Sequence, residues 1–309
     1  KIKTMTLLED IKIYAYLTPD PLDDDSFLEE DWISWLPGYK SGETEEGLPS
    51  FYHEDNVALY ERIEEYTTGL FRAALERMWP ILDGIYIKQI QIAIDYTNFK
   101  NSSALAGYDH HRSNPAKGIY VFHLDQSLLN RYLHVLNGNK QAHLDMNLWE
   151  HELVHMVDHF QSVKESAFYG SDIPQNNLEY YLLKYRSEGL ANLFDLLDGK
   201  IKKFQSRTEA KEKFASNYRQ IQSQVHALEK TTEKIRSEMY EGYDFYEIGP
   251  WLMLDIIGEI LETADLEPVE DLEQKIAQGI AIPDETKLKV LEMAFMIDNE
   301  WFLGKIDLE

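Results

Sequence analysis

The sequence of 309 residues contains no cysteine. This absence excludes disulfide bonds, thiol nucleophiles and every zinc or iron-sulfur site that depends on cysteine ligands. A metal site in this chain therefore has to be built from histidine, aspartate or glutamate side chains.

Basic residues are also scarce, with 30 Lys and Arg against 55 Asp and Glu and a formal net charge of -25. Such a charge repels the phosphates of nucleic acids and anionic lipid surfaces. We therefore expect no nucleic-acid partner, and weakly favour neutral or basic peptides and proteins as substrates. The alternative is that a spread-out acidic excess only confers solubility. The sequence does not indicate an oligomeric state.

Long apolar runs are absent as well, since no run approaches the roughly 18 residues that a membrane-spanning helix requires. We expect a soluble protein that does not insert into membranes. The chain begins at Lys1 and no apolar signal segment follows. Both a cytoplasmic protein and an exported protein whose leader has been removed are compatible with this start.

The first 84 residues combine a short alternating run at 11–16 with a Pro- and Asp-rich stretch at 18–50, which is typical of a long surface loop. The cluster Asp23–Asp25 lacks the glycine and the spaced oxygens of a calcium loop, which favours a solvated turn. Apolar residues at helical spacing predict one long helix over 54–78, with Pro80 as its stop signal.

The following residues predict two strands, at 85–98 and 118–125, joined by a loop. A short helix at 126–136 and a second at 146–161 come next, and the rest of the sequence is overwhelmingly helical. The later helices are expected at 177–198, 207–240, 245–262, 269–278 and 284–302.

The most informative motif is His151-Glu152-Leu153-Val154-His155, whose flanking residues contain no helix breaker. Residues four apart lie above one another on one face of a helix, so both imidazoles can bind one ion. Glu152 lies about 100° further round, where its carboxylate can accept a proton from a water on the metal. The alternative is that both histidines are ordinary core or surface residues.

A catalytic zinc ion needs a third protein ligand and an open fourth position for water. The extended pattern H-E-x-x-H-x-x-G-x-x-H fails, because Asp158 and Gln161 stand where its glycine and last histidine would be. His159 lies about 12 Å along the helix from His151 at 1.5 Å per residue, too far to share one ion. We predict Glu188, from the segment Ser187-Glu188-Gly189-Leu190-Ala191, as the third ligand.

The residues around Glu188 suggest how this ligand is supported. Gly189 and Ala191 are small enough to let two helices approach closely around an ion. Asn192 lies four residues after Glu188, where its amide is expected to hold the outer nitrogen of a zinc-bound histidine, with Asp195 as a weaker candidate.

These two segments resemble the gluzincin branch of the zincin metallopeptidases, the thermolysin-like and aminopeptidase-like group. The resemblance rests on His151 to His155 and on Glu188-Gly189-Leu190-Ala191-Asn192, and it covers roughly residues 85–260. It implies zinc, peptide hydrolysis, and an edge strand that pairs with the substrate backbone, for which 118–125 is the expected segment. The gap from His155 to Glu188 is longer than usual in that group, so an insertion such as 162–175 is assumed.

The resemblance also implies a tyrosine or histidine that stabilises the oxyanion of the tetrahedral intermediate. Tyr246-Glu247-Ile248-Gly249 resembles a Tyr-x-x-Gly element of several gluzincins, so Tyr246 is the first candidate and Tyr243 the second. The alternative for either tyrosine is a buried packing role.

Taken together, we expect an α+β, zincin-like fold with a small mixed β-sheet, an active-site helix and a mostly helical C-terminal lobe. Its segments are an N-terminal extension at 1–84, the sheet and motif helix at 85–165 and the helical lobe at 166–309, which can also form one compact domain. The expected function is a zinc-dependent metallopeptidase, with His151, His155 and Glu188 as Zn²⁺ ligands and Glu152 as general base. The alternatives are an inactive zincin-like binding or regulatory protein, and a metal-dependent hydrolase of a non-peptide bond.

Overall fold

The structure is a computed structural model, and it describes the residues in a set of separate ranges. These are 8–18, 39–43, 49–53, 57–82, 84–95, 106–124, 128, 132, 135–136, 138, 147–162, 178–225, 243–261 and 268–306. The predicted turn at Asp23–Asp25, the assumed insertion at 163–175 and most of the helix predicted at 126–136 lie outside these residues.

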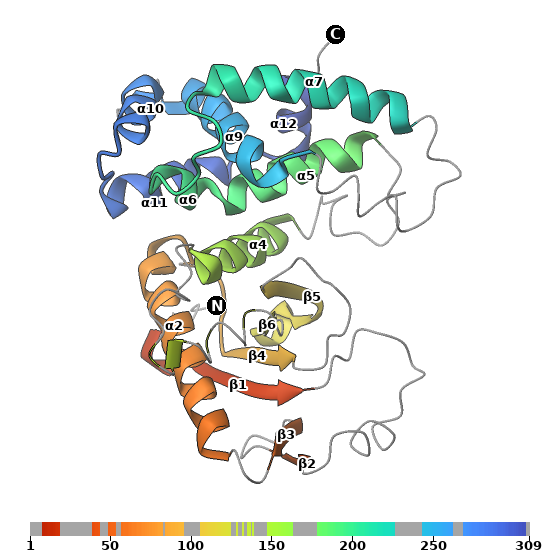
Figure 1. Cartoon of the computed structure of the whole chain (residues 1–309), viewed down its shortest axis with the longest axis vertical. Coiled ribbons are helices and arrows are strands. Elements are labelled where there is room, and N and C mark those ends of the chain that lie inside the picture. The colour runs from red at the N-terminus through yellow and green to blue at the C-terminus, as the bar shows by residue number, and fades with distance from the viewer. Residues whose placement is uncertain are drawn as a thin grey trace, which may run out of the picture. The chain divides into compact units, whose positions relative to one another are not determined.

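The chain has a small mixed sheet, as expected for an α+β protein (Figure 1). Its strands are β1 (Lys12–Thr18), β4 (Gln89–Asp95), β5 (Ala106–Asn114) and β6 (Ile119–Leu124), in the order β1-β4-β6-β5. The first three strands in this order run parallel, and β5 pairs antiparallel with β6. The strands predicted at 85–98 and 118–125 correspond to β4 and β6.

Two strand predictions were wrong. The segment at 106–114 forms β5 instead of part of a loop, and β6 is an interior strand flanked by β4 and β5 instead of an edge. The sequence of β5 is Ala-Gly-Tyr-Asp-His-His-Arg-Ser-Asn, which has few β-branched residues, and its pairing is irregular between Asp109 and Asn114. Strand β5 is the last strand in the sheet order. The short helix η3 (Pro115–Lys117) connects it to its antiparallel neighbour β6.

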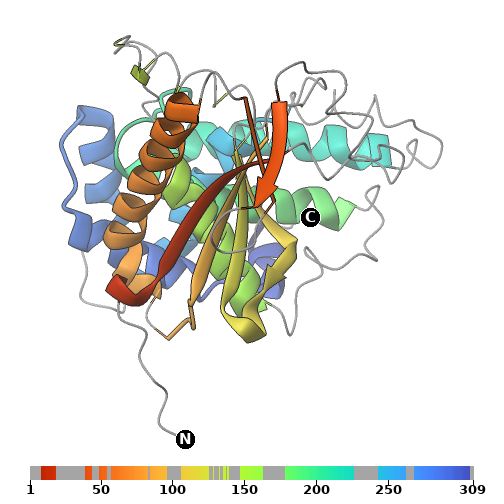
Figure 2. The same ribbon diagram turned by 90° about the horizontal axis from the view of Figure 1, so that it is seen from below.

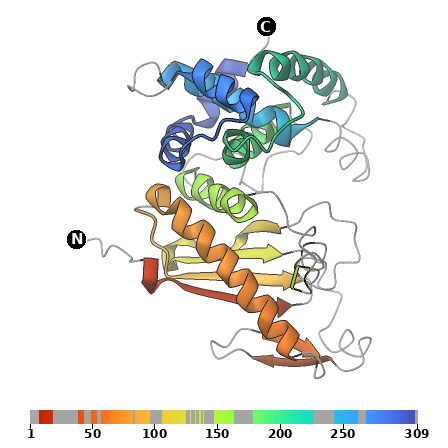
Figure 3. The ribbon, with the colours of Figure 1, turned by 60° about the vertical axis from the view of Figure 1, so that its left-hand side comes forward.

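One face of the sheet is covered by helices α2 (Val57–Leu82) and the first turns of α4 (Leu148–Ser162), as Figures 2 and 3 show from two sides. The ring of Phe71 from α2 lies 4.8 Å from that of Phe122 in β6 and 5.2 Å from that of Trp149 in α4. This aromatic contact fixes the start of α4 against the sheet.

Pro80 does not stop α2, because the helix continues to Leu82. Proline removes one backbone N–H and leaves the carbonyl of residue 76 without its usual donor. Glu76 is exposed, so water can hydrate that carbonyl in the last turn.

The N-terminal part also contains the short helix η1 (Leu8–Asp10) and an antiparallel hairpin of β2 (Tyr39–Glu43) and β3 (Pro49–His53). The prediction of a long surface loop over 18–50 was therefore wrong at β2 and at the start of β3. Residues 19–38 and 44–48 of that stretch lie outside the described residues.

The C-terminal part is helical, as predicted. Its helices are α5 (Leu178–Ala191), α6 (Leu193–Leu197), α7 (Arg207–Val225), α9 (Phe245–Leu261), α10 (Val269–Gln278), α11 (Asp284–Ala294) and α12 (Asn299–Ile306). The chain divides into two compact units, Lys1–Met156 and Val157–Glu309. None of the described helices is long and apolar enough to cross a membrane.

Two predicted helices are each divided in two, and the prediction of continuous helices was wrong there. The helix expected at 177–198 breaks at Asn192, and the one expected at 284–302 breaks between Ala294 and Asn299. The second break has no glycine or proline to mark it. The predicted helix at 207–240 is helical to Val225, and the residues that follow lie outside the described part.

Helix α9 is the centre of the helical unit, with Trp251, Met253 and Leu254 fully buried. It crosses α5 where Gly189 meets Gly249. A Cβ on Gly189 would lie 2.5 Å from the carbonyl carbon and oxygen of Gly249, a distance that real Cβ atoms do not show. The backbones of α5 and α9 can approach this closely only because both residues are glycine.

Candidate metal centre

The motif helix α4 presents its two histidines one turn apart. The Nε2 atoms of His151 and His155 lie 3.0 Å from each other, and their ring centroids are 4.7 Å apart. Two imidazole nitrogens at this separation face the same point, as the spacing of four residues predicts. Both side chains are partly accessible to solvent.

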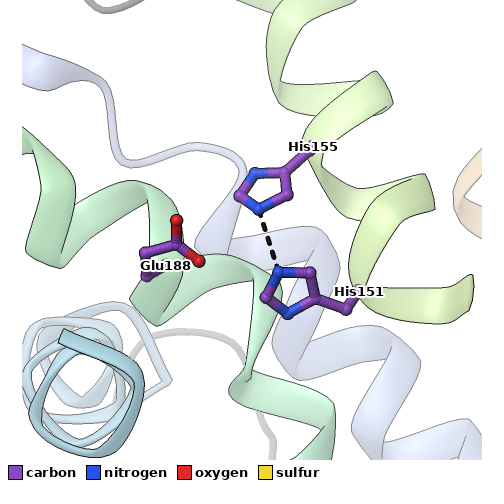
Figure 4. Close-up of side chains that lie close together, drawn as sticks. All are labelled: His151, His155 and Glu188. Atoms are coloured by element: carbon purple, nitrogen blue, oxygen red, sulfur yellow. Dashed lines mark hydrogen bonds between the residues drawn. The ribbon is translucent and has the colours of Figure 1, made fainter. Parts of the chain in front are cut away.

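Glu188 of α5 lies beside this pair (Figure 4). One ligand atom from each of His151, His155 and Glu188 falls within 4.8 Å of the other two. Ligands bonded to a tetrahedral zinc at about 2.1 Å are roughly 3.4 Å apart, so small side-chain adjustments suffice for one ion to reach all three. Two neutral nitrogens and one carboxylate oxygen form a donor set that suits zinc.

The carboxylate of Glu188 is buried, with 3% of the residue exposed, and it forms an ion pair with Lys184 one turn earlier in α5. The Lys184 Nζ lies 2.6 Å from Oε1 of Glu188. Burial lowers the pKa of Lys184, but the negative charge of Glu188 and an interaction with Tyr246 raise it, and the balance leaves this pKa above its ordinary value. Lys184 was not identified from the sequence, because a lysine in a helix is usually a solvated surface residue.

The proposed general base, Glu152, is also buried, with 4% exposed. Its Oε2 accepts a hydrogen bond of 2.8 Å from the backbone N–H of Tyr108 in β5, and its Oε1 lies 3.9 Å from Nε2 of His151. One carboxylate oxygen is thus held by the edge strand while the other lies on the side of the histidines. The sequence could not reveal the contact with Tyr108, because a backbone N–H carries no residue-type signal.

Two expectations about the surroundings of Glu188 were wrong. The side-chain amide of Asn192 donates to the backbone oxygen of Glu188 at 2.8 Å instead of to an imidazole, because the last carbonyls of α5 lack donors within the helix. Gly189 allows the close approach of α9, not of the motif helix. The carboxylate of Asp195 lies 4.0 Å from Nζ of Lys200.

The two candidate tyrosines differ in exposure. Tyr243 is 2% exposed, and its backbone oxygen accepts hydrogen bonds from the hydroxyl of Tyr185 and the amide of Asn217. Tyr246, in the first turn of α9, is 49% exposed and interacts electrostatically with Lys184, the neighbour of Glu188. Of the two tyrosines, Tyr246 is therefore the one whose side chain is accessible to solvent.

The chain contains other histidines besides the pair in α4. In the described part of the chain, the group of His151, His155 and Glu188 is the one set of three or more acids or imidazoles close enough to share an ion. The ring of His123 packs against the edge strand, since a Cβ on Gly107 would lie 2.2 Å from it. His134 and His143 lie outside the described residues.

Comparisons with protein-family models, curated proteins and solved structures find no match to this chain. Its function is therefore inferred from its own residues and their geometry.

Proposed function

We propose that this chain is a zinc-dependent metallopeptidase with a zincin-like fold of the gluzincin type. The observation that carries the proposal is the convergence of His151, His155 and Glu188 within 4.8 Å of one another. The carboxylate of Glu152 lies next to this group, with Oε1 3.9 Å from Nε2 of His151. A structural zinc site has four protein ligands and no open position, so it would not need a further carboxylate beside the metal.

Zinc held by two imidazoles and one carboxylate supplies a Lewis acid and lowers the pKa of a water molecule to about 7. The protein's own contribution is to place acceptors and donors around that position. Glu152 is the proton acceptor, and Oε1 is the oxygen that takes the proton, since Oε2 is held by the N–H of Tyr108. The same carboxyl group then delivers the proton to the leaving amine.

Tyr246 is the proposed donor to the negative oxygen that develops during hydrolysis. Its phenol is exposed and lies in the same electrostatic neighbourhood as Lys184 and Glu188. A hydroxyl that hydrogen-bonds the oxyanion stabilises the transition state more than the substrate.

An extended peptide is the substrate that the sheet favours. Among the described strands β5 pairs on one side only, with β6, and this outer edge carries backbone groups that can pair with another strand. The edge also carries the N–H that holds Glu152, so a peptide bound there would lie next to the proton acceptor.

The test compares metal content and peptide cleavage in three variants of the full chain. Glu152→Gln should retain zinc and lower kcat/KM on a peptide library by about 10³-fold, the middle of the range for loss of a general base. His151→Ala should lose the metal. Glu150→Gln, two residues away and paired with Arg77 at 3.4 Å, is the matched control and should retain activity.

Full activity of Glu152→Gln would remove the proposed mechanism. A wild-type protein that binds zinc but cleaves no peptide in the library would support a binding or regulatory protein, or a hydrolase of another bond, instead.

A further inference from the structure

A buried ion pair connects the two helices that carry the metal-binding residues. Arg186 of α5 donates from Nη1 and Nη2 to the two carboxylate oxygens of Asp158 in α4, at 3.0 and 2.9 Å. Both residues are almost fully buried, with 4% and 3% exposed. Two parallel hydrogen bonds fix the direction of approach as well as the distance.

Asp158 and Arg186 each lie within one helical turn of a ligand on their own helix. Asp158 follows His155 by three residues, and Arg186 precedes Glu188 by two. At a rise of about 1.5 Å per residue these are axial separations of roughly 4.5 and 3 Å. Because a helix is stiff over one turn, the separation of Asp158 and Arg186 constrains that of the turns bearing His155 and Glu188.

A third hydrogen bond fixes the guanidinium itself. The Nε of Arg186 donates to the backbone oxygen of Ile297 at 2.9 Å, in the connection between α11 and α12. Ile297 is fully buried. The planar guanidinium is therefore held on two sides, in a geometry that the single ammonium of lysine cannot reproduce.

Stability alone is a weak explanation for this arrangement, because a buried ion pair often contributes no more than apolar residues of similar volume. Geometric control of neighbouring groups is the better explanation. We propose that Asp158 and Arg186 are positioning residues for the metal centre, which set the distance between the histidine pair and Glu188. This inference rests on the proposed function only in so far as the three residues bind a metal.

Loss of the pair should leave all three ligands in place and make their spacing less defined. Residues that orient metal ligands from outside typically change metal affinity by about 10- to 100-fold when they are replaced. We therefore expect the dissociation constant for zinc to rise within this range.

The test uses the double variant Asp158→Leu with Arg186→Met in the full chain. It removes both charges, so no buried charge is left alone. The measurements are zinc affinity, by competition with a chromophoric chelator, and the visible absorption of bound Co²⁺, which reports ligand geometry. We expect weaker zinc binding and an altered Co²⁺ spectrum, with thermal unfolding of the metal-free form near that of the wild type.

The matched control is Asp198→Leu with Lys287→Met, which removes another, partly buried ion pair of the same helical unit. Its zinc affinity should equal that of the wild type. Arg186→Lys is a second test that keeps the charge but not the two-sided geometry, and its zinc affinity should fall by about 10-fold.

Wild-type zinc affinity and Co²⁺ spectrum in the folded Asp158→Leu, Arg186→Met variant would overturn the inference. If that variant does not fold, unchanged affinity in Arg186→Lys would overturn it equally. Failure of the proposed function gives a different result, since the wild type itself would then bind zinc without cleaving peptides, or bind no zinc at all.

Discussion

The backbone N–H of Tyr108 donates a hydrogen bond of 2.8 Å to Oε2 of Glu152. This bond links the edge strand β5 to the residue that follows the first histidine of the motif. It restricts the carboxylate of Glu152 to one orientation, with Oε1 on the side of His151. The orientation of the proposed base therefore depends on a backbone group, not on a side chain.

Replacing Tyr108 by proline should test this bond, because proline has no N–H. Proline is tolerated in edge strands where the N–H points away from the sheet. We expect kcat for peptide cleavage to fall by about 10- to 100-fold, the equivalent of losing a hydrogen bond to a charged group worth about 1.5–3 kcal/mol. Tyr108→Ala loses the same ring but keeps the N–H, and equal kcat values for the two variants would contradict the prediction.

The ion pair of Lys184 and Glu188 predicts a stability that depends on the metal. Lys184→Met leaves the buried carboxylate of Glu188 without its neighbouring cation in the metal-free protein, which should cost about 3 kcal/mol of unfolding free energy. Zinc supplies positive charge to the same carboxylate, so the zinc-loaded variant should lose less than about 1 kcal/mol. Urea unfolding with EDTA and with excess zinc measures both values.

Lys289→Met is the control for that comparison, because Lys289 pairs with Glu285 at the same spacing of four residues but on the surface. This variant should show no measurable change in unfolding free energy with or without zinc, because the exposed pair is screened by solvent. A loss in Lys184→Met that is equal in both conditions would exclude Glu188 as the carboxylate that zinc neutralises.

The crossing of α5 and α9 predicts that a single methyl group is harmful at Gly189. The Cβ of Gly189→Ala would lie 2.5 Å from backbone atoms of Gly249, so the helices have to separate. We expect a loss of about 1–3 kcal/mol in unfolding free energy, the usual cost of overpacking. Gly304→Ala in α12 meets open space and should instead stabilise the protein by about 0.5–1 kcal/mol. Thermal and urea unfolding check the opposite signs.

Glu64 in α2 predicts a pH-dependent contribution to stability. Burial, and secondarily the negative charge of Glu61, raise the pKa of Glu64 from 4.5 to about 7. The folded carboxyl binds its proton more tightly than the unfolded one, so its stabilising contribution is present below about pH 4.5 and is lost as the pH rises through 7. Glu64→Gln should therefore be more stable than wild type at pH 8, by about 1 kcal/mol after allowance for solvent screening.

Urea unfolding of both proteins at pH 4.5 and pH 8 measures this difference. Glu76→Gln, on an exposed position of the same helix, is the control variant. A stability difference between wild type and Glu64→Gln that stays constant over this range would show that folding does not change the pKa of Glu64.

Local periodicity accounts for most of the fold that could be predicted. The apolar spacing that indicated a helix over 54–78 is the pattern that packs α2 on the sheet through Phe71. Strand β5 was missed because its polar residues give no alternating pattern, and its strand conformation depends on pairing with β6. The break between α11 and α12 was missed because residues 295–298 include no helix breaker, and the buried side chain of Ile297 contributes to the core there.

The sequence by itself determined the pairing of His151 with His155 and the place of Glu152 beside them, because a spacing of four residues is one helical turn and involves only local backbone geometry. It also indicated Glu188 as the third candidate ligand, and this residue lies with the two histidines in the structure. Only the tertiary structure decided that β5 is the edge strand, that Tyr108 holds Glu152, and that Arg186 binds both Asp158 and Ile297. These contacts join residues that are 28, 44 and 111 positions apart. They depend on how whole elements pack, which the spacing of residues in the sequence does not encode.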